Sequence, residues 1–257
     1  VINHLDVEDY LRGVVPAEMQ ASWPIEALRA QAIAARSYVL NSLQPLSDWD
    51  ICATTSCQVY RGTVLEHPDS DRAIADTRGL VLTFEGRFAR TYYHSDSGGM
   101  IASSSEVWGE DLPYLQARSD VPADTPHRLW SQQLNPQQLA AGLRAAGFDV
   151  GTPQSLTVLS YTDSGRVGRL SVQGSAGSAV LSGSQATVLL RGLGVKSTRL
   201  RMTGALTVSG DGWGHGVGMS QYGARSLAQA GHAYDEILAF YYPHTQLSRL
   251  TVVGQAD

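Results

Sequence analysis

Regularly spaced apolar residues near the start of the chain predict an amphipathic helix. Five of them recur at the spacing that places them on one helix face. They are Ile25, Leu28, Ala32, Ala35 and Val39. Pro24 suits the first turn of this helix, which we expect to end near Leu40. Upstream, the residues from Asp6 to Met19 also have helical spacing, but Gly13 and Pro16 predict that this helix is broken into pieces.

Two segments in the middle of the chain predict antiparallel β-hairpins. In each, two apolar stretches flank a short turn that contains glycine. The segments are 80–84 with 88–93 around Glu85-Gly86-Arg87, and 156–161 with 167–172 around Asp163-Ser164-Gly165. Between them, residues 136–146 predict a helix with Asn135 as its N-cap and Gly147 as its stop.

The last third of the chain combines a glycine-rich loop with two helices. Glycine at every second position from Gly210 to Gly218 predicts a tight loop, because such a segment packs neither as a strand nor as a helix. Helices are expected over about 220–230 and 234–242.

Two other segments complete the prediction. Residues 182–190 fit either a helix or an irregular turn, and the Gly- and Ser-rich residues 95–105 predict a loop.

These elements predict an α+β fold with helices at both ends packed around central antiparallel hairpins. We expect a single domain over residues 1–257, with a smaller α+β subdomain at about 121–205. No apolar run of 18 residues predicts a transmembrane helix, and no signal peptide is visible. Because the chain opens at Val1, we expect a trimmed or mature form.

Composition narrows the function classes by exclusion. The chain has 257 residues, of which 43% are hydrophobic and 17% charged, and this is too apolar for a disordered protein. A net charge of −5 gives no basic face for a nucleic-acid backbone. The sole lysine, Lys196, lacks the neighbouring glycine spacing of a Walker-type phosphate loop.

The two cysteines, Cys52 and Cys57, leave three interpretations open. They fit a disulfide outside the cell, a pair of thiols in the cytosol, or half of a zinc site that needs further ligands. A disulfide across so short a loop stabilises a fold by only about 2 kcal/mol.

Two residues stand out as candidates for chemistry. Glu18 has apolar neighbours, and desolvation raises the pKa of a carboxyl group toward the range of a general acid; a surface carboxylate near a helix start is the ordinary alternative. His215 lies between two glycines, so its ring is unhindered, although a loop histidine bound by the backbone fits equally well. Arg36, on the flank of the first apolar stripe, has the pattern of a solvated helix residue.

Other patterns point away from proteolysis. Ser95-Asp96-Ser97-Gly98-Gly99 is similar to the nucleophile loop of serine proteases, but no upstream histidine stands in the required setting. The zinc-protease pattern His-Glu-x-x-His is absent.

Several aromatic residues suit either stacking on sugar rings or packing in a core; they are Tyr93, Trp108, Trp213 and Tyr222.

Taken together, motifs spread from residue 6 to residue 244 resemble the SpoIID/LytB family of bacterial cell-wall proteins. The motifs occur in family order and include Val14-Val15-Pro16-Ala17-Glu18-Met19, Cys57-Gln58-Val59-Tyr60-Arg61-Gly62, Tyr93-His94-Ser95-Asp96-Ser97-Gly98-Gly99 and Gly212-Trp213-Gly214-His215-Gly216-Val217-Gly218-Met219-Ser220-Gln221-Tyr222-Gly223-Ala224. The resemblance implies a SpoIID-like catalytic domain over nearly the whole chain.

The resemblance implies a lytic transglycosylase of peptidoglycan. Such an enzyme cleaves the bond between N-acetylmuramic acid (MurNAc) and N-acetylglucosamine (GlcNAc), in strands expected to lack stem peptides, and leaves 1,6-anhydro-MurNAc ends. The family's catalytic glutamate corresponds to Glu18. One carboxylate is then enough, because the C6 hydroxyl of the sugar attacks within the same molecule.

The resemblance also implies binding residues, a partner and a location. The expected substrate contacts are Arg36, Tyr93, Ser97, Gly98, Gly99, Trp213, His215, Ser220, Gln221 and Tyr222. Glycines in the two loops are expected to let a polysaccharide approach the backbone. The expected location is outside the cytoplasmic membrane, in the cell wall or periplasm, and a cell-wall amidase is a candidate partner. A glycan-binding enhancer of an amidase, without catalysis, is the alternative function.

Some family members hold zinc in the cysteine loop with the help of histidines. Here Ser56 stands where those members often have histidine. This difference disfavours zinc and favours a disulfide between Cys52 and Cys57, so no cofactor is expected.

Overall fold

The computed structural model describes residues 2–44 and 46–250, and within them the chain divides into two compact units. Unit 1 is formed by the chain up to Tyr93 and again from Ala224, and unit 2 is His94–Gly223. The mixed helices and small antiparallel sheets confirm the expected α+β class. The subdomain expected at about 121–205 falls inside unit 2.

Unit 1 is mainly helical. Its described residues form the helices α1 (Val7–Glu18), α2 (Ile25–Ser42), α3 (Pro68–Asp76), most of α7 (Gln221–Gln229) and α8 (Tyr234–Tyr241), together with the 3-10 helix η1 (Gly62–Leu65). The helices predicted over 24–40, 220–230 and 234–242 are confirmed as α2, α7 and α8.

The predicted breaks in the first helix are wrong, since α1 is continuous and contains Pro16 in its last turn. Buried Leu11, Val14 and Val15 hold α1 in the core of unit 1, and tertiary packing of this kind outweighs local propensity. Gly13 allows the backbone of α1 to lie close to the Tyr60 ring, because a Cβ added at Gly13 would lie 2.5 Å from that ring.

The first predicted hairpin is present but shorter than expected. Strand β1 (Leu80–Phe84) pairs with β2 (Arg87–Phe88) across a turn at Glu85 and Gly86, which both have positive φ. The other edge of β1 pairs with β13 (Gln246–Arg249), a strand that the apolar pattern does not predict. The stretch after Phe88 contributes instead to β3 (Tyr93–His94), which pairs with β12 (Met219–Ser220).

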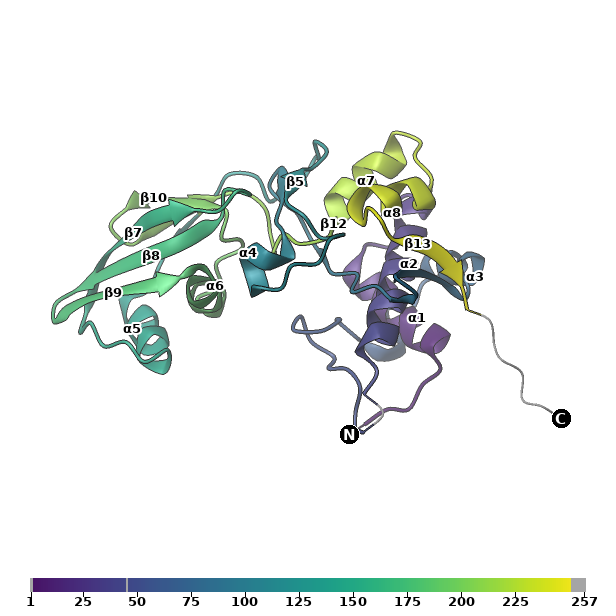
Figure 1. The fold of residues 1–257 in the computed structure, drawn as a ribbon, viewed down its shortest axis with the longest axis horizontal. Helices are drawn as coiled ribbons and strands as arrows, with labels where there is room; N and C mark the ends of the chain where they lie inside the picture. Colours follow the sequence, from purple (N-terminus) through teal and green to yellow (C-terminus); the bar gives the residue numbers. More distant parts are fainter. Residues whose placement is uncertain (1, 45, 251–257) are drawn as a thin grey trace. The chain divides into compact units, whose positions relative to one another are not determined.

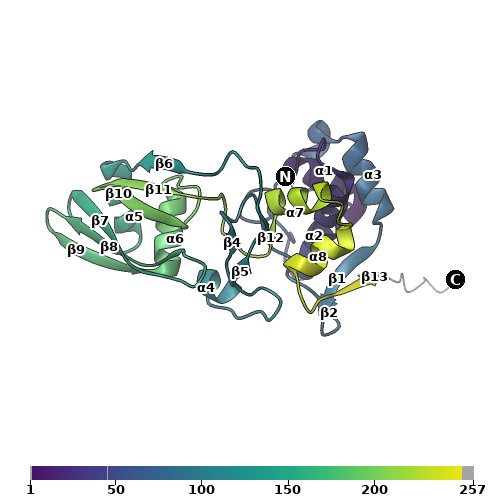
Figure 2. The same ribbon diagram turned by 90° about the horizontal axis from the view of Figure 1, so that it is seen from above.

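Unit 2 contains a larger antiparallel sheet that two helices cover. The second predicted hairpin is confirmed as β7 (Pro153–Tyr161) and β8 (Val167–Gly174), and β9 (Gly177–Ser182) adds a third strand. Helices α5 (Pro136–Ala145) and α6 (Gly183–Gly192) pack on this sheet (Figures 1 and 2). The sequence leaves residues 182–190 open, and the structure makes them helical, with a capping box between Ser182 and Gln185.

The remaining elements of unit 2 are short. They are β4 (Met100–Ile101), α4 (Ser104–Trp108), β5 (Arg118–Ser119), β6 (Trp130–Gln133), β10 (Leu200–Gly204) and β11 (Thr207–Gly210). Because β4 and the start of α4 fall in 95–105, that segment is not wholly loop as predicted. Apolar side chains from β6 to β11 form one buried cluster around Leu170 and Leu190.

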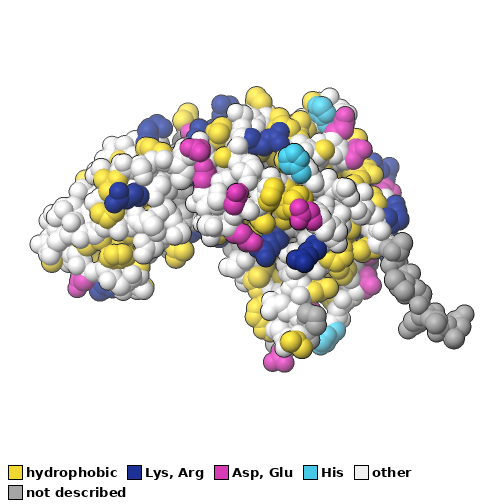
Figure 3. Space-filling view, in the orientation of Figure 1, with side chains coloured by type: hydrophobic (Ala, Val, Ile, Leu, Met, Phe, Trp, Pro, Cys, Tyr) yellow, Lys and Arg dark blue, Asp and Glu magenta, His cyan; other side chains and the backbone are white. Residues whose placement is uncertain are grey.

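Two further features of the described structure are the distribution of charge on its surface and the length of its helices. On the face in Figure 3, acidic and basic side chains are interspersed, and no single sign of charge covers it. Over residues 2–44 and 46–250, none of the helices combines the length and the apolar character that crossing a bilayer requires.

Candidate functional site

In unit 1, Glu18 is the last residue of α1 and its side chain is half-buried. The backbone N–H of Val59 donates a hydrogen bond of 2.7 Å to Glu18 Oε1. The helix therefore carries the carboxyl group at its end, and the loop that follows the second cysteine fixes its orientation.

Three tyrosines surround this carboxyl group. Burial raises the pKa of Tyr10 and of Tyr93, and the charge of Glu18 is the second cause in each. Burial, Tyr92 and then Glu18 raise the pKa of Tyr38. All three hydroxyls therefore stay protonated near neutral pH, and a protonated hydroxyl can donate a hydrogen bond to a carboxylate or a sugar oxygen.

Gln58 connects the tyrosines to the helices. Its side chain is fully buried, accepts from the Tyr10 hydroxyl at 3.1 Å, and lies 3.1 Å from the Tyr93 hydroxyl through Nε2. Nε2 also donates to the backbone carbonyl of Ala35 in α2 at 3.2 Å. Gln58 therefore ties the residues around Glu18 to the core of unit 1.

A disulfide closes the loop that precedes Gln58. Cys52 and Cys57 are joined, with their Cα atoms 5.5 Å apart. This is the pairing that the resemblance favours. Among the residues that the structure describes, no group of three or more His, Cys, Asp or Glu side chains is placed to hold a metal ion.

Arg36 is not on a solvated flank, as its position in the sequence suggests, but fully buried in α2. Its guanidinium donates to both carboxylate oxygens of Glu8, at 2.9 and 2.8 Å, and to the backbone carbonyl of Leu80 at 3.0 Å. A side chain without exposed surface cannot contact a glycan. Arg36 instead joins α1, α2 and β1.

Unit 2 brings together two of the predicted loops, which we call the serine loop (residues 95–99) and the glycine loop (residues 210–218). Their backbones pair at one point, where Asp96 N donates to Trp213 O at 3.0 Å and Trp213 N donates to Asp96 O at 2.8 Å. The pairing fixes the backbone of Trp213 and leaves its side chain at the surface.

Glycines in these loops mostly allow contact between the loops themselves. Gly212 has φ +84°, and a Cβ added there would lie 2.7 Å from the carbonyl oxygen of Asp96. A Cβ on Gly98 would lie 2.9 Å from the carbonyl carbon of Asp211. Only Gly99 of these three faces open space. The room expected for a polysaccharide is therefore occupied by protein at Gly98 and Gly212.

Two histidines lie against the glycine loop. Buried His94 donates from Nδ1 to the carbonyl of Val217 at 3.1 Å, and the N–H of Val217 donates to Nδ1 of His215 at 3.0 Å. Burial first, then His215 and Arg166, hold the pKa of His94 well below its ordinary value. The ring of His215 lies 5.0 Å from that of Trp108 and is tilted by 54° against it. Since Nδ1 of His215 accepts a hydrogen bond, the ring hydrogen belongs on Nε2.

Arg166 supports both loops from inside. It is 2% exposed and donates to the carbonyls of Met100 and Ser97 at 2.9 and 3.1 Å. Gly216 lies directly against its guanidinium, where a Cβ would clash at 1.9 Å. Burial and the nearby Arg199 lower the pKa of Arg166 to about 10, so it remains charged near neutral pH.

The exposed part of the glycine loop is aromatic. Trp213 is 48% exposed. His127 meets its ring edge-on at 4.6 Å and that of half-buried Tyr222 at 5.4 Å. Burial is the main cause that lowers the pKa of His127, followed by Lys196. The result is an exposed indole on a fixed backbone, with two further rings beside it.

Three predicted contact residues are buried instead. Ser97 is 1% exposed and donates to Asp120 at 2.6 Å. Ser220 is fully buried and accepts from Gly223 N at 3.2 Å in the first turn of α7. Gln221 is 6% exposed. We assign structural roles to Ser97 in the serine loop and to Ser220 at the start of α7.

Sequence reasoning does not single out several residues that complete these clusters. Gln58 lies within the motif Cys57-Gln58-Val59-Tyr60-Arg61-Gly62, which carries the family resemblance, so its position was a usable signal. Tyr10 lies in the helical stretch from Asp6 to Met19. Tyr38 stands directly before Val39, the last residue of the first apolar stripe, and His94 lies in the motif Tyr93-His94-Ser95-Asp96-Ser97-Gly98-Gly99. Arg166 stands at the end of a hairpin turn, where nothing in the sequence marks it.

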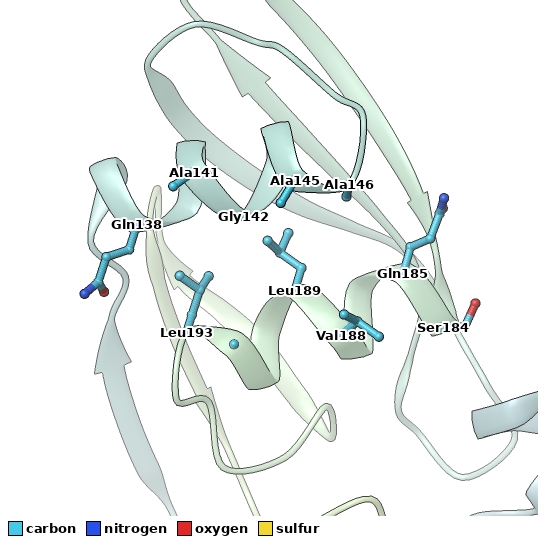
Figure 4. Close-up of a pocket in the computed structure, with 11 residues that line it drawn as sticks. Gln138, Ala141, Gly142, Ala145, Ala146, Ser184, Gln185, Val188, Leu189 and Leu193 are labelled. Carbon is cyan, nitrogen blue, oxygen red and sulfur yellow. The ribbon is translucent and has the colours of Figure 1, made fainter. Parts of the chain in front are cut away.

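A separate groove of about 720 Å³ lies between α5 and α6 (Figure 4). Leu189 of α6 points toward α5 across it. None of the described residues that line the groove is acidic, basic, histidine or cysteine. The groove thus holds no group for acid–base chemistry and shares no residue with the two loops.

Comparison with known proteins places these features in a family. The SpoIID model, described as stage II sporulation protein, matches residues 1–84, and that of a domain of unknown function (DUF8618) matches residues 127–218. An uncharacterized protein of Brachyspira hyodysenteriae is 31% identical over 94% of this chain and 66% of its own length. The amidase enhancer of Bacillus subtilis is 32% identical over 93% of this chain and 40% of its own length.

The chain therefore spans less than two thirds of the length of both these relatives. The stage II sporulation protein D of Bacillus subtilis is 29% identical over 96% of this chain and 76% of its own length. Because similarity to proteins of these names runs through nearly the whole chain, the chain belongs to the SpoIID family.

Proposed function

We propose that this protein is a lytic transglycosylase that cleaves the MurNAc–GlcNAc bond of peptidoglycan strands and leaves 1,6-anhydro-MurNAc ends. The observation that supports it most is the setting of Glu18. A half-buried carboxyl group stands at the end of α1, oriented by Val59 N–H, among tyrosine hydroxyls that remain protonated.

One carboxyl group can serve both halves of this reaction. In the first half, protonated Glu18 gives its proton to the glycosidic oxygen as the bond to C1 of MurNAc breaks. In the second half, the Glu18 carboxylate takes the proton of the C6 hydroxyl, whose oxygen forms the new bond to C1. Water takes no part, and intramolecular attack removes most of the orientation entropy that a separate nucleophile would cost.

In this proposal four predicted residues of unit 2, each exposed or half-buried, contact the glycan. They are Gly99, Trp213, His215 and Tyr222. Tyr93 orients Glu18 through Gln58 and the neighbouring tyrosines. Arg36, Ser97 and Ser220 act only through the fold.

We further propose that the protein works outside the cytoplasmic membrane, in the cell wall or periplasm. The Cys52–Cys57 disulfide supports this location, because disulfides persist in oxidising compartments. The name of the amidase enhancer relative supports a link to a cell-wall amidase as partner. It also keeps open a second function, in which the protein binds glycan and stimulates an amidase without cleaving the strand.

The test is mass spectrometry of purified glycan strands after incubation with wild type and with Glu18→Gln. We expect anhydro-MurNAc ends from wild type, and a decrease of at least about a hundredfold with Glu18→Gln, because glutamine can neither give nor take the proton. Strands with and without stem peptides are compared in parallel.

Glu85→Gln is the matched control, since it makes the same chemical change at an exposed turn of unit 1. It should retain wild-type product formation. Full activity of folded Glu18→Gln would exclude the proposed catalytic role. Binding of strands by wild type without new anhydro ends would favour the amidase-enhancing function.

A further inference from the structure

Lys196 is the one lysine of the chain, and the mechanism above does not use it. Its Nζ lies 5.3 Å from the centroid of the exposed Trp213 ring. A cation over an indole ring is attracted by the ring, and the pair together offers both a stacking face and a positive charge.

No carboxylate neutralises this ammonium group within the part of the chain that the structure describes. Its interactions there are the contact with Trp213 and the electrostatic effect on His127. The carboxylate of the serine loop, that of Asp96, is engaged elsewhere. Asp96 accepts from Gly98 N at 2.9 Å and from Thr125 Oγ1 at 2.8 Å.

The backbone around the pair is held in place on both sides of Trp213. Gly214 N donates to the carbonyl of Lys196 at 2.8 Å, and Gly212 N donates to the carbonyl of His127 at 3.0 Å. With the Asp96 pairing at Trp213 itself, three consecutive residues of the glycine loop are fixed. A site held in this way loses little conformational entropy when a ligand binds.

We propose that Lys196 and Trp213 form a subsite for a sugar that carries a free carboxylate, namely MurNAc whose lactyl group bears no stem peptide. The sugar ring stacks on the exposed indole, and the lactyl carboxylate pairs with the Lys196 ammonium. A stem peptide would convert that carboxylate into an amide and remove its charge. Lys196 is then a specificity residue that favours stripped strands.

Because this subsite rests on the proposed function, its test measures binding and is independent of cleavage. All proteins carry Glu18→Gln so that no strand is cut during the measurement, and affinity is determined by calorimetry. Three probes are compared: amidase-stripped strands, the same strands with their carboxylates coupled to methylamine, and strands that keep their stem peptides.

We expect Lys196→Met to weaken binding of stripped strands about tenfold, since a charge-assisted hydrogen bond is lost. The affinity of Lys196→Met for the methylamidated strands and for the peptide-bearing strands should stay within about twofold of that of the protein with Lys196. Lys196→Arg should retain most of the preference for stripped strands over the other two probes. Added salt should reduce this preference, because it screens the charge of the ammonium group. Arg144→Met removes the same charge from an exposed position on α5 and should change nothing.

Three results would overturn the subsite. One is unchanged binding of stripped strands by Lys196→Met, and another is equal weakening for all three probes. The third is weakening for peptide-bearing strands alone, which would assign the ammonium to a stem-peptide carboxylate. Failure of the wild type to make anhydro ends, with these affinities as expected, would refute the proposed catalysis and leave the subsite standing.

Discussion

At the scale of single residues, the environment that the sequence predicts for a side chain can differ from the one it has in the fold. Arg36 has the spacing of a solvated helix residue, yet it is fully buried and forms a two-oxygen ion pair with Glu8. A buried guanidinium is stable only where hydrogen bonds replace its hydration, and here Glu8 and backbone carbonyls supply them.

Arg36→Met tests this structural role. Removal of the guanidinium leaves Glu8 without its partner, and we expect the free energy of unfolding to fall by about 3–5 kcal/mol. Urea unfolding followed by circular dichroism measures the change. Arg72→Met is the control, because its side chain is 66% exposed and its contact with Asp76 is 3.8 Å; it should cost less than about 1 kcal/mol. Equal losses in the two variants would contradict the role of Arg36.

At the same scale, the glycines of the serine loop and the glycine loop fall into two groups: those that face another backbone and those that face open space. Gly212 and Gly99 both have positive φ, but only Gly212 faces another backbone. Gly99→Ala should cost the strain of the left-handed conformation alone, about 1–2 kcal/mol. Gly212→Ala should cost about 1–3 kcal/mol more, because its Cβ overlaps the Asp96 carbonyl. Thermal unfolding of the two variants side by side gives the difference, and the explanation fails if Gly99→Ala is the less stable.

At the scale of elements, apolar periodicity predicts the long helices and the hairpins well. It fails where an element is determined by a distant partner. Strand β13 exists because it pairs with β1, some 160 residues earlier in the chain. Likewise, α1 remains continuous through Pro16 because its buried face packs against α2 and the loop at Tyr60.

The disulfide loop is the element that links stability to the candidate site. Replacement of both cysteines, Cys52→Ser with Cys57→Ser, should lower the free energy of unfolding by about 2 kcal/mol, through the entropy of the opened loop. The anhydro product yield should fall as well, because Val59 and Gln58 directly follow Cys57 and orient Glu18 and its tyrosines.

Reducing agent provides the matched check on this variant. It should reproduce both losses in wild type and have no effect on the double variant. If the double variant keeps wild-type stability and product yield, the loop does not position Glu18.

At the scale of the whole molecule, the chain builds two units and crosses between them twice. It enters unit 2 after Tyr93 and returns to unit 1 at Ala224. The candidate acid and its tyrosines belong to unit 1, whereas the serine loop, the glycine loop and the Lys196–Trp213 pair belong to unit 2. Each unit has its own buried core, so each can hold its own group of candidate residues in place.

The sequence by itself determined the fold class, most helices, two hairpins and the family, and it pointed to Glu18 as the candidate acid. These follow from local periodicity, turn chemistry and ordered motifs, which need no knowledge of distant contacts. Tertiary structure alone decided which motif residues are buried and which are exposed. Ser97, Ser220 and Arg36 lie inside, while Trp213 lies at the surface. Tertiary structure also brought Gln58 to the tyrosines, Arg166 beneath the loops and Lys196 over Trp213. Burial and pairing of this kind depend on contacts between residues far apart in sequence, and no local pattern encodes them.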